Sequence, residues 1–172
     1  MAQRADLIEL ETLQLRSGEA RKLDSEVRVD PILLGGEPYV VDGGTVDARL
    51  DVSRTISGYA LRLRFDAPMA GMCMRCTGEA MPVFSVDARE VDQPGEAEEF
   101  HSPYVEDDLL DLSAWARDAL VLAMPAQVIC SEDCLGLCTV CGANLNEADP
   151  DEHRHESSGD PRWSKLRDLN LG

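Results

Sequence analysis

The chain has 172 residues and a formal net charge of −17 at pH 7, with 33 acidic residues against 16 Lys and Arg. Such an acidic surface repels phosphate, so it disfavours direct, non-specific nucleic-acid binding and favours a basic protein partner. No apolar run approaches the roughly 20 residues that span a bilayer, and the first residues do not form the apolar segment of a signal peptide. We therefore expect a cytoplasmic protein with no membrane partner.

The N-terminal region, residues 1–92, is predicted to be a β-rich domain. The apolar residues expected to enter an opening strand are Leu7, Leu13 and Leu15. Residues 19–29 are more polar. Hydrophobic residues then alternate with polar ones over residues 46–52 and again over residues 59–65. This is the period of two expected for strands with one buried face.

A Cys-x-x-Cys turn, Cys73 to Cys76, separates the second of these strands from a third one. The inward positions of the third strand are expected to be Phe84, Val86 and Ala88. The turn is therefore predicted at the tip of a β-hairpin, where a bound metal would fix the register of the flanking strands. Gly78 follows the turn, and glycine adopts φ > 0 without steric cost.

An acidic linker is predicted at residues 93–110, within a stretch that contains no Lys or Arg. It is interpreted as a mobile loop, which serves either as a contact for a cationic partner or only as a solvated connection. Asp111 is then predicted to cap a helix that runs to Ala123 and is closed by Pro125.

The last region, residues 111–172, adds a Cys/His-rich tail to this helix. Together with the first turn it supplies eight candidate zinc ligands: Cys73, Cys76, Cys130, Cys134, Cys138, Cys141, His153 and His155. Zinc prefers thiolate and imidazole, and eight such groups suffice for two closed tetrahedral sites. We expect at least one zinc ion, with ligands for a second. The fold class is α+β and β-rich: an antiparallel sheet or partly open barrel, one main helix, and a zinc-bound C-terminal tail that packs back on the N-terminal half.

The spacing of the ligands leaves their pairing open. The preferred arrangement joins the two Cys-x-x-Cys turns, 73/76 and 138/141, around one ion. The second ion would then bind Cys130, Cys134, His153 and His155. In the alternative, the first turn shares an ion with Cys130 and Cys134, and the last turn shares one with the two histidines. A single ion with some of these ligands free is a third arrangement.

The order of motifs along the chain is distinctive. After Cys73-x-x-Cys76 and the acidic linker come Asp111-Leu112-Ser113, Met124-Pro125, Cys130-x3-Cys134-Leu-Gly-Leu-Cys138-x2-Cys141-Gly142, Asn144-Leu145-Asn146 and Asp160-Pro161-Arg162. Over residues 5–170 this order resembles the YceD family, the large ribosomal RNA subunit accumulation proteins. Cysteine-rich relatives usually carry Cys-x-Cys where this chain has His153-Arg154-His155. Histidine is also a zinc ligand, so the exchange is chemically coherent.

The resemblance implies a role in the synthesis, processing or accumulation of 23S rRNA. We find no Ser/His/Asp set, phosphate-binding glycine loop or carboxylate constellation of recognisable geometry. We therefore expect a non-catalytic ribosome-biogenesis factor, not an enzyme, with structural zinc and a basic ribosomal protein or assembly partner. Contact with rRNA would be indirect. Two alternatives are a zinc-dependent RNA-binding module that uses Arg62, Arg64 and Arg75, and a redox protein that uses a Cys-x-x-Cys dithiol.

Overall fold

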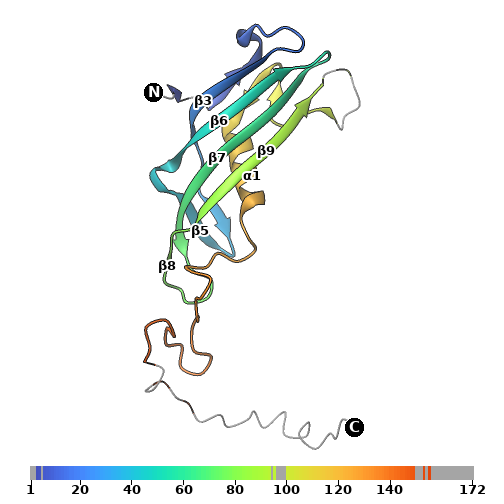
Figure 1. Ribbon diagram of the computed structural model, residues 1–172. Helices are drawn as coiled ribbons and strands as arrows, with labels where there is room; N and C mark the ends of the chain where they lie inside the picture. Colours follow the sequence, from blue (N-terminus) through green and yellow to red (C-terminus); the bar gives the residue numbers. More distant parts are fainter. Residues whose placement is uncertain are drawn as a thin grey trace, which may run out of the picture.

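The computed structural model describes residues 3–4, 6–93, 95, 100–149, 153 and 155. Its strands are β1 (Gln3–Arg4), β2 (Leu7–Glu9), β3 (Ala20–Arg28), β4 (Ile32–Leu34), β5 (Glu37–Val41), β6 (Thr45–Arg54), β7 (Tyr59–Met72), β8 (Glu79–Ala80), β9 (Val83–Asp92), β10 (Val105–Glu106) and β11 (Leu109–Asp111). The described helices are η1 (Leu10–Leu13) and η2 (Asp42–Gly44), both 3-10, and α1 (Leu112–Ala123). Figure 1 shows them in an elongated arrangement, with the Cys/His-rich segment beyond the β8 end.

The long strand β7 organises the main sheet. It pairs antiparallel with β6 along its first half, with β5 near Met69 and Ala70, and with β9 on its other side. β3 pairs antiparallel with β6, and the short β1 adds a parallel partner to β3. The expected β-rich fold of antiparallel sheets with one α-helix is confirmed for the described residues.

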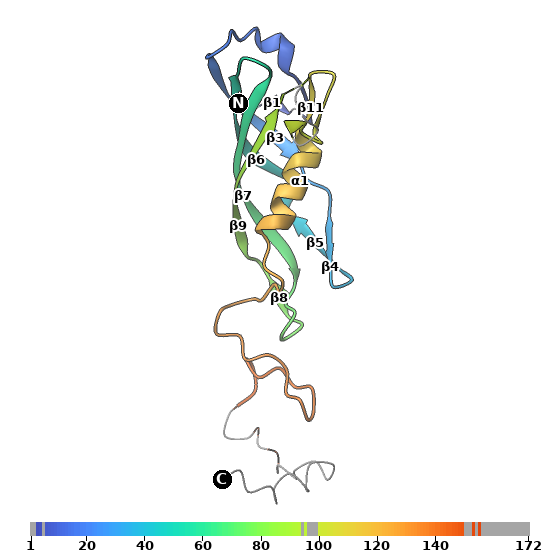
Figure 2. The ribbon, with the colours of Figure 1, turned by 90° about the vertical axis from the view of Figure 1, so that its right-hand side faces the viewer.

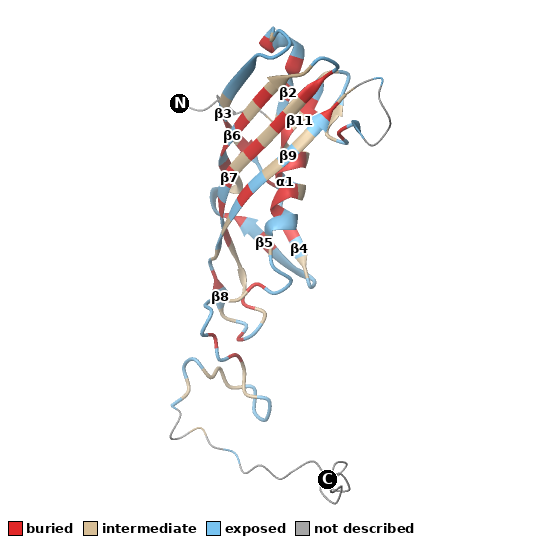
Figure 3. Cartoon of the chain, turned by 45° about the vertical axis from the view of Figure 1, so that its right-hand side comes forward, coloured by how far each residue is buried: buried red, intermediate tan, exposed pale blue. Residues whose placement is uncertain are grey.

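One face of this sheet is apolar and lies against α1 (Figure 2). Its buried residues on β6 and β7 are Val46, Ala48, Leu50, Val52, Leu61, Leu63, Phe65 and Ala67. All of these except Ala67 are positions that the period of two predicted. The buried side of α1 includes Trp115, Ala116 and Leu120. In Figure 3, buried residues alternate with less buried ones along β6 and β7 and also occur on α1.

The predicted start and end of α1 are confirmed. The Asp111 side chain accepts a hydrogen bond from the backbone N–H of Ala114 at 2.9 Å, which satisfies one of the free donors of the first turn. The helix ends at Ala123, just before Met124-Pro125. It therefore delivers the following segment to the β8 end of the sheet.

A second, smaller sheet has the strand order β10-β11-β2. The acidic stretch predicted as a linker thus contains strands in its second half. Asp107 and Asp108 form the tight turn between β10 and β11, with φ angles of 49° and 60°. Asp tolerates this left-handed region better than most residues, and a turn with two positive φ angles matches the twist of a hairpin.

The opening strand is shorter than expected: of Leu7, Leu13 and Leu15, only Leu7 lies in β2, while Leu13 belongs to η1. Leu7 is 55% exposed, whereas the buried residues are Ile8, Leu10 and Leu13. Ile8 is inward on β2, while Leu10 and Leu13 belong to η1. Because the chain leaves the strand after three residues and turns as a 3-10 helix, a single strand register does not describe this segment.

Candidate metal centre

The first Cys-x-x-Cys turn lies between β7 and β8, at the tip of the hairpin where it was predicted. We call residues 73–78 the first knuckle. The N–H of Cys73 donates to the carbonyl of Gly78 at 2.7 Å, and the N–H of Thr77 donates to the carbonyl of Cys73 at 2.9 Å. The N–H of Arg75 donates to the Cys73 sulfur at 3.4 Å. The backbone therefore curls around the position of a metal.

The second knuckle, residues 138–143, repeats these three bonds. The N–H of Cys138 donates to the carbonyl of Ala143 at 2.8 Å, and the N–H of Gly142 donates to the carbonyl of Cys138 at 2.9 Å. The N–H of Val140 donates to the Cys138 sulfur at 3.4 Å. Two segments far apart in sequence thus adopt one local fold.

The residue after each pair of cysteines takes a positive φ: Thr77 at 58° and Gly142 at 76°. In the first knuckle the left-handed residue is Thr77, whereas the sequence led us to expect Gly78 at that position. The hydrogen-bond pattern explains the difference, since the left-handed residue is the one whose N–H donates back to the first cysteine. In the first knuckle that residue is threonine.

The inner tetrad consists of Cys73, Cys76, Cys130 and Cys134, whose sulfurs all lie within 4.8 Å of one another. The Cys73 and Cys134 sulfurs are 3.8 Å apart, and the Cys76 and Cys130 sulfurs are 3.7 Å apart. A tetrahedron with zinc–sulfur bonds of about 2.3 Å has edges of about 3.8 Å. The sulfur positions therefore fit a single zinc ion.

Hydrogen bonds to sulfur set the protonation of this tetrad. Burial raises the pKa of Cys73, but backbone N–H groups that point at its sulfur outweigh burial and lower the pKa to about 6. One of these donors is the N–H of Cys130, at 3.3 Å. The N–H of Gly78 lowers the pKa of Cys76, yet burial and the neighbouring thiols raise it to about 12. Zinc binds thiolates, so an ion in this tetrad would displace the protons that its sulfurs still carry.

The outer tetrad consists of Cys138, Cys141, His153 and His155. The Cys141 sulfur lies 3.8 Å from Nε2 of His153, which lies 3.2 Å from Nε2 of His155. The N–H groups of Cys141 and Val140 and the His153 ring together lower the pKa of Cys138 to about 6. Cys141 and His155 are exposed, so this tetrad is more open to water than the inner one.

The structure corrects the preferred pairing of ligands. The two knuckles do not share an ion site; the first knuckle meets Cys130 and Cys134, and the second meets the two histidines, as in the alternative arrangement. The physical reason is chain direction. The N–H of Met74 donates to the carbonyl of Val128 at 2.9 Å, so the segment after α1 reaches the first knuckle before the chain arrives at Cys138.

Three residues around the tetrads were not singled out from sequence. Tyr39 donates from its hydroxyl to the carbonyl of Met72 at 2.6 Å and so holds the base of the first knuckle. Asn146 donates to the Cys134 sulfur at 3.6 Å. Thr77 takes the left-handed position. An Asn beside a cysteine cluster is a recognisable donor to sulfur, but the other two roles depend on packing and turn geometry.

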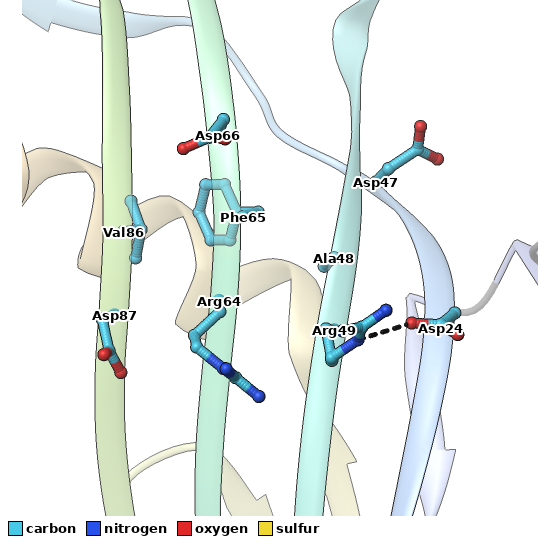
Figure 4. A pocket seen from close by; sticks show the side chains of 9 residues that line it. All are labelled: Asp24, Asp47, Ala48, Arg49, Arg64, Phe65, Asp66, Val86 and Asp87. Carbon is cyan, nitrogen blue, oxygen red and sulfur yellow. Dashed lines mark hydrogen bonds and ion pairs between the residues drawn. The ribbon is translucent and has the colours of Figure 1, made fainter.

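Two of the three arginines proposed for RNA contact, Arg62 and Arg64, lie on the open face of the main sheet, whereas Arg75 lies in the first knuckle. Arg62 bonds to Asp87 from Nε at 2.7 Å, and Arg64 bonds to Asp51 at 2.6 Å. A depression of about 340 Å³ lies on this part of the sheet. Figure 4 shows the side chains that line it, among them Arg49 paired with Asp24. Each of these guanidinium groups on the sheet is therefore already matched with a carboxylate.

The fold and the site define a class: a β-sheet protein with one described α-helix and two Cys/His tetrads, each able to hold a metal ion such as zinc. The chain belongs to the YceD family, because the family profile described as "Large ribosomal RNA subunit accumulation protein YceD" matches residues 61–170. Both knuckles lie inside this match. The family is not known as an enzyme family, and membership implies a role in large-subunit rRNA accumulation.

Relatives cover most of the chain. Uncharacterized proteins of Mycobacterium bovis and Mycobacterium tuberculosis are each 30% identical to it over 171 residues, which is 94% of this chain and 80% of the relative. An uncharacterized protein of Mycobacterium leprae is 29% identical over 147 residues, covering 79% of this chain and 64% of that protein. No solved structure matches the chain. Within the described part of the chain, none of the helices combines the length and apolar character needed to span a bilayer.

Proposed function

We propose that this chain is a non-catalytic ribosome-biogenesis factor that supports the synthesis, processing or accumulation of 23S rRNA and holds structural zinc in both tetrads. The observation that carries the proposal is the family match over residues 61–170. The match includes the hairpin, α1 and both knuckles, so it covers the same segments that build the metal centre.

The ligand sets favour structural over catalytic zinc. A catalytic zinc ion keeps one position for water or substrate, whereas a structural ion is closed by four protein ligands. Each tetrad supplies four ligands. The inner one joins the β7–β8 hairpin to the segment after α1, so an ion there would tie two distant parts of the chain together.

The open face of the main sheet carries no net charge, so the acidic residues that give the chain its net charge lie elsewhere. The outward positions of β3, β6, β7 and β9 carry six basic residues, Lys22, Arg28, Arg49, Arg62, Arg64 and Arg89. They also carry six acidic residues, Asp24, Glu26, Asp47, Asp51, Asp66 and Asp87. These charges cancel. A basic partner would therefore find its contact elsewhere on the molecule.

The small sheet offers such a contact. Its inner face buries Ile8 and Leu110, and its outer face presents Leu7, Glu9, Glu106 and Leu109. Leu7 and Leu109 are 55% and 41% exposed. The acidic turn of Asp107 and Asp108 lies beside them. We propose that this acidic, partly apolar face binds a basic ribosomal protein or assembly partner, at the end of the sheet away from the tetrads (Figure 2).

The rRNA role is tested by depletion. Cells whose only copy of the gene can be switched off are followed for large-subunit precursor and mature rRNA, with small-subunit rRNA as the internal control. We expect precursor to rise or mature 23S rRNA to fall while the small-subunit species stay level. Unchanged large-subunit species would overturn the proposal.

The partner surface is tested with purified large-subunit ribosomal proteins on immobilised full-length chain. Glu9→Gln with Glu106→Gln removes two charges from the small sheet. Asp47→Asn with Asp66→Asn removes two charges from the open face and serves as the matched control. Retention at moderate salt should fall for the first pair only. Equal retention by both pairs would mean that the small sheet does not select the partner.

The alternative of direct RNA binding is supported less well. Arg62 and Arg64 are paired with carboxylates, and releasing them would cost those bonds before any phosphate could be bound. Binding of rRNA fragments that weakens with salt and is lost on mutating Arg62, Arg64 and Arg75 would favour this alternative instead.

Two observations favour the redox alternative, the lowered pKa of Cys73 and the lowered pKa of Cys138. A low pKa is typical of reactive cysteines, but those are also accessible. Cys73 is fully buried and its sulfur faces three other cysteines, so its thiolate is better suited to a metal than to an external disulfide. A reversible Cys73–Cys76 disulfide in metal-free chain would support redox function.

A further inference from the structure

The second knuckle rests on the first. The N–H of Leu137 donates to the carbonyl of Arg75 at 3.1 Å, and Arg75 lies between the two cysteines of the first knuckle. Gly136 makes this approach possible, because a Cβ there would lie 3.2 Å from the same carbonyl oxygen, and its φ is +79°. The base of the second knuckle is therefore bonded to the backbone of the first knuckle. An ion in the inner tetrad would fix the position of that backbone.

Asn146 provides a second link, through its side chain. Its Nδ2 donates to the sulfur of Cys134, an inner ligand, at 3.6 Å. Its Oδ1 accepts from the N–H of Leu135 at 2.8 Å. Asn144 adds to this arrangement, because its Oδ1 accepts from Nδ2 of Asn146 at 2.8 Å. The side-chain amide of Asn146 therefore bonds both to an inner sulfur and to the segment that leads into the second knuckle.

The two sides of the second knuckle are also joined at its base. Leu137 and Asn144 form an isolated antiparallel bridge, and the N–H of Leu145 donates to the carbonyl of Gly136 at 2.9 Å. Ordering one side therefore orders the other. Cys138 and Cys141 lie between these two sides, so their sulfurs are brought together once the base is held.

We propose that the two tetrads bind metal in a fixed order and with positive cooperativity, the inner one first, and that Asn146 is the positioning residue that couples them. An ion in the inner tetrad fixes Arg75 and Cys134, and these fix the base of the second knuckle. The outer ligands are then preorganised, so less entropy is lost when the second ion binds. The proposal rests on the zinc-binding part of the function proposed above and goes beyond it.

Cobalt(II) titration of metal-free, reduced, full-length chain tests the order. Four thiolates and a mixed set of thiolates and imidazoles give Co²⁺ different charge-transfer and ligand-field bands, so the two tetrads can be followed separately. In the unmodified chain the four-thiolate bands should be complete before the mixed bands begin. Hydrogen exchange at the amides of Leu135 and Leu137 should slow with the first equivalent.

The variant Asn146→Ala removes the coupling amide and keeps all eight ligands. Its four-thiolate bands should still come first, while the affinity of the outer tetrad should fall about 5- to 150-fold, the range of a typical coupling free energy. Glu147→Gln, one residue further, is the matched control because it keeps an oxygen for Asn144 and does not touch the inner tetrad. It should titrate as the unmodified chain does.

Two ligand variants test which tetrad must be filled first. Cys130→Ser with Cys134→Ser should remove the four-thiolate bands and weaken the mixed bands as well. His153→Ala with His155→Ala should remove the mixed bands only. If the outer tetrad binds with unmodified affinity in the Asn146→Ala chain, or fills first, the coupling is refuted although metal binding stands. If neither set of bands develops, the zinc-binding proposal itself fails.

Discussion

Cys73 and Cys138 occupy the same position in two copies of one local structure, each sulfur accepting a backbone N–H from the second residue after it at 3.4 Å. The short sequence around each Cys-x-x-Cys pair is enough to produce the turn. What differs is the surroundings: Cys73 is buried beneath the sheet end, and Cys138 is only partly covered. The same ligand pair therefore forms part of a buried centre in one place and an accessible one in the other.

The left-handed residue of each knuckle gives a first prediction. Gly142→Thr should lower the free energy of unfolding of the zinc-loaded protein by about 1–3 kcal/mol, because a β-branched residue is strained at positive φ. Thr77→Gly should be neutral or stabilising, since it removes that strain at the cost of backbone entropy, about 0.5–1 kcal/mol.

Gly78→Ala is the control for this pair and should be tolerated. Its φ is not in the left-handed region, and the new Cβ would lie 3.5 Å from the Cys76 sulfur, an ordinary contact. Denaturant unfolding of the four proteins at saturating zinc provides the comparison. A large loss for Gly78→Ala with none for Gly142→Thr would reverse the assignment of the two positions.

The burial of the two tetrads gives a second prediction. Cys134→Ser should lower the free energy of unfolding by at least about 3 kcal/mol, because structural zinc contributes about 10–16 kcal/mol and the inner tetrad ties the hairpin to the segment after α1. Cys141→Ser should release the outer metal with little effect on the sheet, since the outer ligands all come from the last part of the chain. Metal content and melting temperature are measured on the same samples of both variants. A melting temperature that falls as much for Cys141→Ser as for Cys134→Ser would contradict the prediction.

Much of the sheet could be predicted because its central strands alternate cleanly. β3 was missed for a local reason: Ser25 stands at an inward position, only 6% exposed, between Leu23 and Val27. One polar residue interrupted the apolar alternation. The helix was predictable from its cap, since Asp111 is a side chain whose role depends only on its immediate neighbours.

The candidate ligands could be named from sequence, but their pairing could not. Spacing limits which cysteines can meet, and it allowed either knuckle to join Cys130 and Cys134. The choice depends on the course of the chain after α1. That course is set by a tertiary contact, the hydrogen bond between Met74 and Val128. Asn146 was quoted as part of a motif, yet its link to the Cys134 sulfur depends on how the chain folds back between these two residues.

Tyr39 gives a third prediction, on how the first knuckle is supported. Its hydroxyl is bonded to the carbonyl of Met72, directly before Cys73, and burial raises its pKa. Tyr39→Phe should cost about 0.5–1.5 kcal/mol, the net value of one hydrogen bond. Gly71→Ala should cost about 1–3 kcal/mol, because a Cβ at Gly71 would lie 2.2 Å from Cδ1 of the Tyr39 ring. Chemical denaturation with zinc present tests both; wild-type stability for Gly71→Ala would contradict this packing.

Two carboxylates on β9 give a final prediction, in which similar substitutions act in opposite directions. Asp87 faces the open side of the sheet, where its hydrogen bond with Arg62 lowers its pKa. Its ionised form is therefore stabilised by folding. Asp87→Asn should destabilise the protein at neutral pH, and the difference should disappear as the pH falls below the ordinary Asp value and through the lowered one.

Glu90 faces the other side, beside Tyr104 and Trp115, where burial raises its pKa although Ser102 bonds to it. Here folding penalises the ionised form, so the carboxylate costs stability above its raised pKa and costs nothing once the pH falls below the ordinary Glu value. Glu90→Gln should therefore raise the melting temperature at neutral pH and have no effect near pH 4. Because metal release at low pH is common to all variants, the comparison is made as a difference from the unmodified chain at each pH. A lower melting temperature for Glu90→Gln at neutral pH would contradict this. It would mean that the hydrogen bonds of the Glu90 carboxylate stabilise the folded state by more than its burial destabilises it.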